Sequence, residues 1–317
     1  MEFNLTTNRN LVGKIIYITR IRNGATILRK RCIQIENIPA ISAIYFALLQ
    51  TGYDFFRFEK PNELTDKLSR FINDQYESRF FSYAKQTTCD VYPYWPRASM
   101  LEAASFYVDL MSFQFRDFAK FKTSVMAANN IKEAERNSDF WNWITDFPMQ
   151  LKQILTNKNF QAYFEWENDW IAKQNCIYTE ELSTAQKCLN ICNRLYDSPI
   201  TDVLIVVNPI KCAYSADYHI RGKKLIFSSG TFSAESVIHE FIHHVAHSII
   251  TSNSDGILQC DISNLGIDRS YYLTNDDAGI LNAFEEYFVR RLTVEIIADN
   301  PPKNLSDFLS QTLVMLK

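Results

Sequence analysis

The first half of the chain changes from two short β-rich stretches to a series of helical patterns. Residues 11–21 and 26–35 are rich in β-branched side chains, and the Asn-Gly pair between them is a strong signal for a β-hairpin. After Pro39, apolar residues recur at helical spacing. The segments with this spacing are 41–49, 63–83, 99–121, 130–135, 139–155 and 160–173. We expect Pro148 to break or kink the fifth of them.

The second half has a different pattern, in which short β-rich runs separate the helical segments. The expected order is a helix at 180–196, strands at 202–207, 218–220 and 224–228, a helix that contains 236–247, a polar loop at 251–277, and helices at 277–297 and 305–316. This order predicts an α+β fold that is mostly helical, with a small sheet backed by helices. The last strand before the helix at 236–247 would lead into any site on that helix, and an edge strand there could hold an extended peptide.

The change of pattern suggests two regions, a β-hairpin and helical region at 1–157 and a second region at 158–317. No Gly/Ser-rich linker marks this boundary, so one compact unit is the alternative. The chain has 317 residues with 23 Phe and 16 Tyr but only 8 Gly, which is typical of a compact globular protein.

Charge, hydropathy and cysteine usage narrow the class of protein. The net charge of -3 shows no basic bias, so we expect no nucleic-acid partner. The N-terminus lacks a basic region followed by an apolar core, and no apolar run reaches 18 residues, so we expect no membrane segment. Seven cysteines without a Cys-x-x-Cys pair are typical of reduced thiols, and we expect a cytoplasmic protein.

The most informative stretch is His239-Glu240-Phe241-Ile242-His243, which has the pattern His-Glu-x-x-His. On a helix, residues four apart lie on the same face, so His239 and His243 can both bind one zinc ion. Glu240 lies beside them and can take a proton from a water molecule that the ion activates. We expect Ser233 to cap the N-terminus of this helix. The apolar face comprises Ile238, Phe241, Ile242, Val245 and Ile249.

The other histidines are assigned by their place on the same helix. We expect His244 to point away from the metal site and His247 to be exposed or to support the site without binding the ion. The alternative interpretation of the whole stretch is a helix whose histidines are exposed or hydrogen-bonded in place.

A third protein ligand is needed, and the helix at 277–297 carries two adjacent acids, Glu285 and Glu286. A helical projection places Glu285 beside Leu281 and Phe288 on the buried face. A carboxylate turned toward the interior is costly unless it is paired or binds a metal, which favours Glu285 as the ligand. Glu286 is the alternative, either as the ligand or as an acceptor for a histidine N–H.

This combination resembles the gluzincin group of zinc metallopeptidases, the thermolysin-like clan. The resemblance covers residues 180–297 and rests on the His-Glu-x-x-His helix, the preceding strand and the downstream helix that bears Glu285. It implies a zincin-like catalytic region, with Zn²⁺ held by His239, His243 and Glu285 and with Glu240 as the general base. The chain departs from the pattern at Asn282-Ala283, where many members have Asn-Glu, and the spacing from His243 to Glu285 is longer than in thermolysin.

The resemblance implies hydrolysis of a peptide or protein substrate. Two alternatives are a dedicated regulatory or toxin-system protease with one protein substrate, and a non-catalytic interaction protein that retains the scaffold. Hydrolysis also needs a hydrogen-bond donor for the developing oxyanion. The candidates are Tyr271, Tyr272, Tyr287 and His219.

Overall fold

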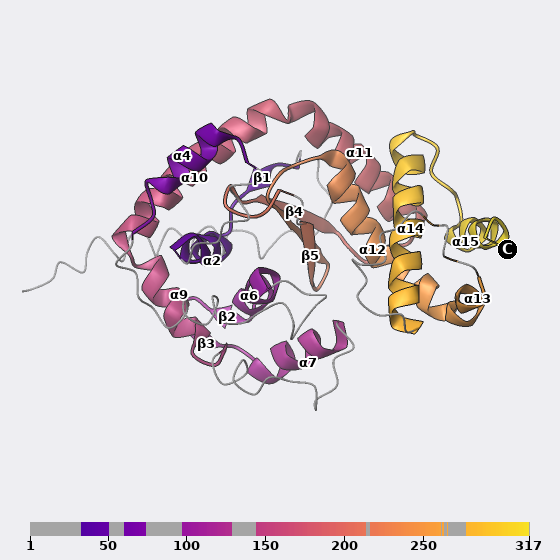
Figure 1. The fold of residues 1–317 in the computed structure, drawn as a ribbon, viewed down its shortest axis with the longest axis horizontal. Helices are drawn as coiled ribbons and strands as arrows, with labels where there is room; N and C mark the ends of the chain where they lie inside the picture. Colours follow the sequence, from indigo (N-terminus) through magenta and orange to yellow (C-terminus); the bar gives the residue numbers. More distant parts are fainter. Residues whose placement is uncertain are drawn as a thin grey trace, which may run out of the picture. The chain divides into compact units, whose positions relative to one another are not determined.

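A computed structural model of the chain gives the positions of most residues. It describes residues 33–50, 60–73, 97–128, 144–213, 216–260, 262, 265 and 277–316. The predicted N-terminal hairpin at 11–35 lies outside the described residues except for its last few positions, and the predicted helix at 130–135 lies outside them entirely. The described elements confirm an α+β fold that is mostly helical with a small sheet (Figure 1).

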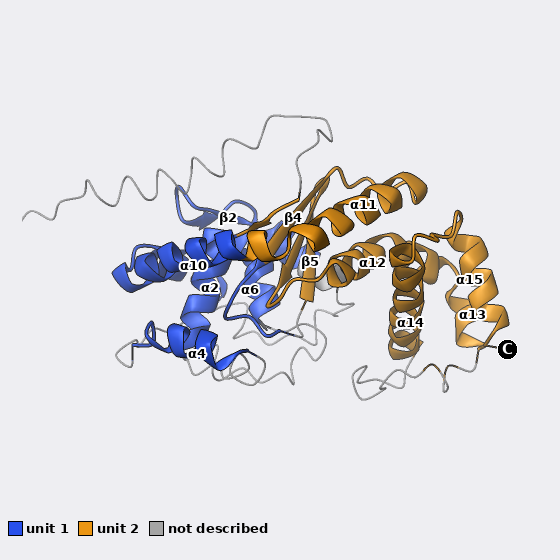
Figure 2. Ribbon diagram, turned by 90° about the horizontal axis from the view of Figure 1, so that it is seen from above, with its two compact units in different colours: residues 1–29, 37–173, 207–215 blue, residues 30–36, 174–206, 216–317 orange. Residues whose placement is uncertain are grey.

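The chain divides into two compact units, shown in blue and orange in Figure 2. Unit 1 comprises residues 1–29, 37–173 and 207–215, and unit 2 comprises 30–36, 174–206 and 216–317. Neither unit is one continuous segment. Residues 30–36 and 207–215 each belong to a different unit from the residues that flank them in the sequence.

The sheet has four strands in the order β1-β4-β6-β5. These strands are β1 (Ile35–Glu36), β4 (Asp202–Val207), β5 (Ala216–Arg221) and β6 (Lys224–Ser229). β1 and β4 are parallel, whereas β5 and β6 form an antiparallel hairpin whose turn contains Gly222 at a φ of 63°. A positive φ of this kind is cheap only for glycine. Among the described strands, β5 lies at one end of the order. The last strand before the predicted metal helix, β6, lies between β4 and β5, so the expectation that it is an edge strand is wrong.

The other edge of the sheet is closed by a side chain. The amide of Asn175 donates to the carbonyl of Ile35 and accepts from its N–H, both at 2.8 Å. A strand edge presents such main-chain groups unpaired, so Asn175 satisfies at β1 the groups that a further strand would satisfy.

The described part of unit 2 contains five helices besides the end of α10 (Lys158–Ile177). They are α11 (Thr179–Leu195), α12 (Ala234–Ser252), α13 (Ser254–Leu258), α14 (Asp277–Ile297) and α15 (Leu305–Val314). α12 packs against α11 on one side and α14 on the other, and it also contacts β5 and β6 (Figure 1). Ser233 caps α12 as predicted, because its hydroxyl accepts from the N–H of Ser236 at 3.1 Å. The predicted apolar face is buried apart from Ile249, which is only partly covered.

Unit 1 is built around α2 (Pro39–Gln50), which is buried along almost its whole length. It packs against α6 (Arg97–Ser105) and α9 (Phe147–Leu155). The other elements that lie in or begin in this unit are α4 (Asn62–Ser69), β2 (Val108–Asp109), β3 (Gln114–Phe115), α7 (Phe118–Ala128) and α10 (Lys158–Ile177). Pro148 lies in the first turn of α9, where its missing N–H costs nothing, so the predicted break at this proline is confirmed.

The prediction of one helix over 99–121 is wrong, because α6 ends at Ser105 and a β-hairpin separates it from α7. Local hydrogen bonds explain the interruption. The carboxylate of Asp109 accepts from the N–H of Met111 at 3.2 Å and from the hydroxyl of Ser112 at 2.9 Å. Phe113 then adopts a positive φ of 51°, which ends any helix. Side chain to backbone bonds of this kind compete with helical ones and give no periodic signal.

Unit 1 also buries two carboxylates. Glu102 is fully buried and forms an ion pair with Lys211 at 3.0 Å, and it accepts a hydrogen bond from the hydroxyl of Tyr45. Glu167 is fully buried as well, and it accepts from Tyr163 at 2.9 Å and from Asn208 at 2.8 Å. Both groups are thus satisfied by hydrogen bonds, but only Glu102 has a cation beside it among the described residues.

Glu167 is expected to make unit 1 less stable as the pH rises. Burial raises its pKa from 4.5 to about 7, despite the hydrogen bonds that favour its ionised form. The folded protein therefore holds this proton more tightly than the unfolded chain, and the extra stability present below pH 4.5 is lost as the pH rises to about 7. The difference amounts to roughly 3 kcal/mol in the free energy of unfolding.

Urea unfolding of wild type and Glu167→Gln at several pH values between 4 and 8 measures this effect. The variant should lose most of the pH dependence over that interval, because it carries no titrating group at this position. Glu165→Gln, an exposed change on the same helix, is the control. Equal pH profiles in wild type and Glu167→Gln would contradict the prediction.

Of the helices in the described ranges, none has the length and apolar character needed to cross a membrane. Of the described cysteines, those at positions 176, 188, 192 and 260 are free thiols.

Candidate metal centre

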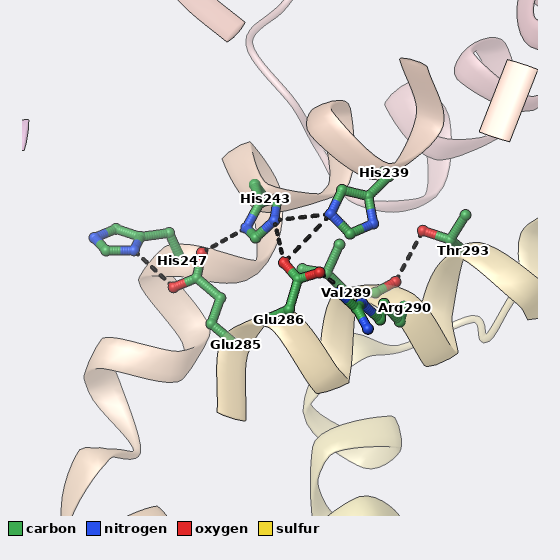
Figure 3. A network of polar contacts seen from close by, with 8 residues as sticks. All are labelled: His239, His243, His247, Glu285, Glu286, Val289, Arg290 and Thr293. Carbon is green, nitrogen blue, oxygen red and sulfur yellow. Dashed lines mark hydrogen bonds and ion pairs between the residues drawn. The ribbon is translucent and has the colours of Figure 1, made fainter. Parts of the chain in front are cut away.

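The candidate site lies where α12 and α14 pack side by side in unit 2 (Figure 3). His239 and His243 are four residues apart on α12 and point their imidazoles toward α14. Glu285 and Glu286 project from α14 toward these rings. The helical spacing predicted the shared face of the two histidines, and the packing of α14 supplies the acids.

Three side chains converge on one point. The Nε2 atoms of His239 and His243 are 3.2 Å apart, and the Oε2 atom of Glu286 lies 3.4 Å from the first and 3.3 Å from the second. These residues form the group that could hold a metal ion among the described residues. In a tetrahedral zinc site with bonds of about 2.0–2.1 Å, neighbouring ligand atoms lie about 3.3 Å apart. The mutual distances of the three ligand atoms therefore match those of a tetrahedral zinc site.

The two N···O distances in this triangle are longer than those of ordinary N–H···O hydrogen bonds, which are about 2.7–3.2 Å. The carboxylate of Glu286 faces both imidazoles at almost equal distances.

The structure places Glu286, and not Glu285, in the converging group. The helical projection assumed that burial would distinguish the ligand, but the side chains of Glu285 and Glu286 are 12% and 14% exposed. Burial therefore cannot separate them. The two acids differ in their positions relative to the histidines of α12, and the packing of α12 against α14 sets these positions.

Glu285 instead contacts His243 at Nδ1, the ring nitrogen that does not take part in the converging group. Its Oε1 atom lies 2.9 Å from Nδ1 of His243, and its Oε2 atom lies 2.9 Å from Nδ1 of His247 (Figure 3). An ionised carboxylate can only accept hydrogen bonds, so both Nδ1 atoms carry protons. In a neutral His243 this leaves Nε2 with a free lone pair directed at the converging point, as metal binding requires.

Arg290 holds the carboxylate of Glu286. Its Nε donates to Oε1 of Glu286 at 2.6 Å, one turn further along α14. Because Oε1 is occupied in this way, Oε2 remains directed at the two histidines (Figure 3). A partner of this kind fixes the orientation of a ligand before the ion binds.

The charges around the site favour a cation. Burial lowers the pKa of His243, but its hydrogen bonds to Glu285 and Glu286 outweigh this effect. The charge of Glu240 adds to them, and the pKa of His243 rises to about 10. Burial likewise raises the pKa of Glu285 and of Glu286, yet the facing histidines hold the pKa of both acids below its usual value. Three carboxylates thus surround the imidazoles with negative potential.

Tyr218 is a neighbour of the site that the sequence analysis did not single out. It comes from β5, and its ring lies nearly parallel to that of His243, with an interplanar angle of 12° and centroids 6.4 Å apart. Burial raises the pKa of Tyr218 well above its usual value, and the charges of Glu285 and Glu240 raise it further. The phenol therefore keeps its proton and can act as a donor. The sequence signal that could have identified Tyr218 was an aromatic residue next to His219, in the hairpin that precedes α12.

Glu240 is half-buried on α12, next to His239. Its charge raises the pKa of both His243 and Tyr218, so its carboxylate lies in the same electrostatic environment as these two rings. A carboxylate in this position can act as the general base that the motif predicts for Glu240.

The remaining candidates are less well placed. Tyr271 and Tyr272 lie outside the described residues. His219 is buried, and it lies on the opposite face of β5 from Tyr218 because side chains alternate along a strand. The ring of Tyr287 lies 5.9 Å from the guanidinium of Arg291.

His244 is not part of the converging group. It packs edge-on against Phe241, and its buried Nε2 atom has no hydrogen-bond partner within the part of the chain that the structure describes. Burial lowers its pKa and so favours the neutral imidazole. It therefore serves as an internal control for experiments on the metal centre.

No protein-family model, curated protein sequence or solved structure matches this chain. The resemblance to the gluzincins therefore stays a prediction, and the function must be argued from the site.

Proposed function

We propose that this protein is a zinc-dependent peptidase of the gluzincin type with a zincin-like catalytic region in unit 2. His239, His243 and Glu286 would hold the ion, and Glu286 would take the place that the sequence analysis gave to Glu285. The observation that carries the proposal is the triangle of ligand atoms with sides of 3.2, 3.3 and 3.4 Å, which matches a tetrahedral zinc site.

The reaction needs a Lewis acid, a base and a donor. When bound, zinc lowers the pKa of a water molecule and polarises a carbonyl group. Glu240 would accept a proton from that water molecule on its carboxylate and pass it to the leaving amine. Tyr218 would donate its O–H to the oxygen that gains charge in the transition state.

A peptide is the substrate class that the resemblance to the gluzincins implies. β5 contacts α12, so a substrate bound at the ligand-bearing helix would lie beside this strand. Side chains on the Tyr218 face of β5 would then choose among substrates, and Ile220 on that face is exposed.

The same site would also suit a dedicated protease with one protein substrate. Such a protease would differ only in the substrate that binds beside β5. A non-catalytic interaction protein is the other alternative. Metal analysis of the purified protein, combined with digestion of a peptide mixture followed by mass spectrometry, tests the proposal. We expect one zinc ion per chain and hydrolysis that a chelator stops. Protein that folds equally well without metal and binds none would contradict it and favour the interaction protein.

Tyr218→Phe should lower kcat by about 10²-fold or more while zinc binding stays unchanged, because the variant keeps the ring and loses only the donor. Steady-state kinetics with zinc content measured in parallel checks this. Tyr287→Phe, a matched change on α14, should have little effect. Wild-type kcat in Tyr218→Phe would exclude the donor role.

A further inference from the structure

His247 lies outside the ligand group, yet it is tied to it through Glu285. Both oxygens of the Glu285 carboxylate are engaged, one by Nδ1 of His243 and the other by Nδ1 of His247, each at 2.9 Å (Figure 3). His247 stands one turn beyond His243 on α12, and its side chain is 68% exposed.

We propose that His247 is a positioning residue for the metal centre: it clamps Glu285, and Glu285 in turn orients His243. This inference rests on the proposed metal site and extends it to a residue that does not bind the ion. Three histidines of α12 would then contribute to the metal centre. Two would hold the ion, and the third would maintain the orientation of His243 through Glu285.

The geometry explains why a clamp is useful. A glutamate side chain has three rotatable bonds, and a carboxylate held by one hydrogen bond can still swing about that contact. A second hydrogen bond to the other oxygen fixes the plane of the carboxylate. Because Oε1 of Glu285 then stays at Nδ1 of His243, the ring of His243 keeps the orientation in which Nε2 points at Glu286 and His239.

The position of His247 separates this role from a packing role. The ring is mostly exposed, so it contributes little to the core, and the predicted apolar face of α12 does not include it. His247 is also not one of the three residues whose ligand atoms converge, so its contact with Glu285 is what ties it to the site.

Two substitutions separate the hydrogen bond from the ring. In His247→Asn the side-chain amide nitrogen takes the place of Nδ1 and can still donate to Glu285, whereas His247→Leu keeps the bulk and loses the donor. Partners of metal-ligating residues contribute about 10- to 100-fold in affinity. His247 acts one residue further away, so we expect His247→Leu to weaken zinc binding by about 10-fold and His247→Asn to stay near wild type. Competition with a chelator at fixed pH measures this.

A second measurement does not depend on zinc. The nitrogen chemical shifts of His243 in the metal-free protein report the hydrogen bond at its Nδ1, and they should change in His247→Leu and not in His247→Asn. Ser248→Leu, an exposed change at the next position of α12, controls for a new apolar side chain on this surface.

The outcomes discriminate clearly. Wild-type affinity and shifts in His247→Leu would overturn the clamp, and equal losses in His247→Leu and His247→Asn would assign the effect to the ring and not to its donor. Wild-type protein that binds no zinc would overturn the metal centre itself. In that case the His243 shifts would still show whether His247 holds Glu285.

Discussion

Replacing Glu240 with Gln is expected to slow hydrolysis by about 10²- to 10⁴-fold while the protein still binds zinc. The amide has the shape of the carboxylate but cannot accept a proton, and general-base catalysis of this kind contributes about 10²- to 10⁴-fold. Glu240 is half-buried beside His239 and is not one of the three converging groups, so its replacement leaves the ligand set intact. Peptide hydrolysis and zinc content, measured on the same preparation, check both parts of the prediction.

Glu235→Gln is the matched control, because Glu235 is an exposed acid in the first turn of the same helix. It should retain full activity. Full activity in Glu240→Gln would remove Glu240 from the mechanism, and loss of zinc together with activity would mean that Glu240 supports the metal centre and is not simply a base.

Replacing Glu286 with Gln is expected to weaken zinc binding more than replacing Glu285 with Gln. Glu286 directs an oxygen at both His239 and His243, and the variant would deprive the ion of its one charged ligand in the group. Glu285 acts only through Nδ1 of His243, so its loss should cost about 10- to 100-fold in affinity. His243→Ala should resemble Glu286→Gln because it removes another ligand.

Competition with a chelator at fixed pH ranks these variants, because ligand protonation otherwise changes the apparent affinity. His244→Ala is the control, since His244 lies on the same helix outside the ligand group, and it should bind zinc like wild type. A larger loss from Glu285→Gln than from Glu286→Gln would show that the ligand is the one favoured by the helical projection. Equal losses in all four variants would mean that zinc binds elsewhere.

Local sequence was sufficient for the central helix and for the two histidines on it that converge, His239 and His243. The spacing of four residues between His239 and His243 fixes their common face in any α-helix, and Ser233 marks the helix start by its own hydrogen bond. The apolar periodicity of α14 likewise predicted a helix at 277–297, and α14 has these bounds. These features depend on residues within a turn or two of one another, which a sequence displays directly.

Local sequence was not sufficient between residues 99 and 121. The apolar spacing there is helical, but the hydrogen bonds of Asp109 and the positive φ of Phe113 interrupt the helix. A side chain that satisfies neighbouring main-chain groups offers the backbone an alternative to the helix, and periodicity does not record it.

The choice between Glu285 and Glu286 depended entirely on tertiary structure. The two acids are adjacent, have the same chemistry and are almost equally exposed, so no property of α14 alone distinguishes them. The crossing of α12 over α14 decides that Oε2 of Glu286 meets both histidines while Glu285 meets the far side of one ring. Tyr218 reaches the site for a similar reason, because β5 packs beside α12. The sequence by itself therefore determined which residues of α12 share the face of the candidate site. Only the packing of separate elements decided which partners complete the site, because a distance between two helices is set by all the side chains that pack between them.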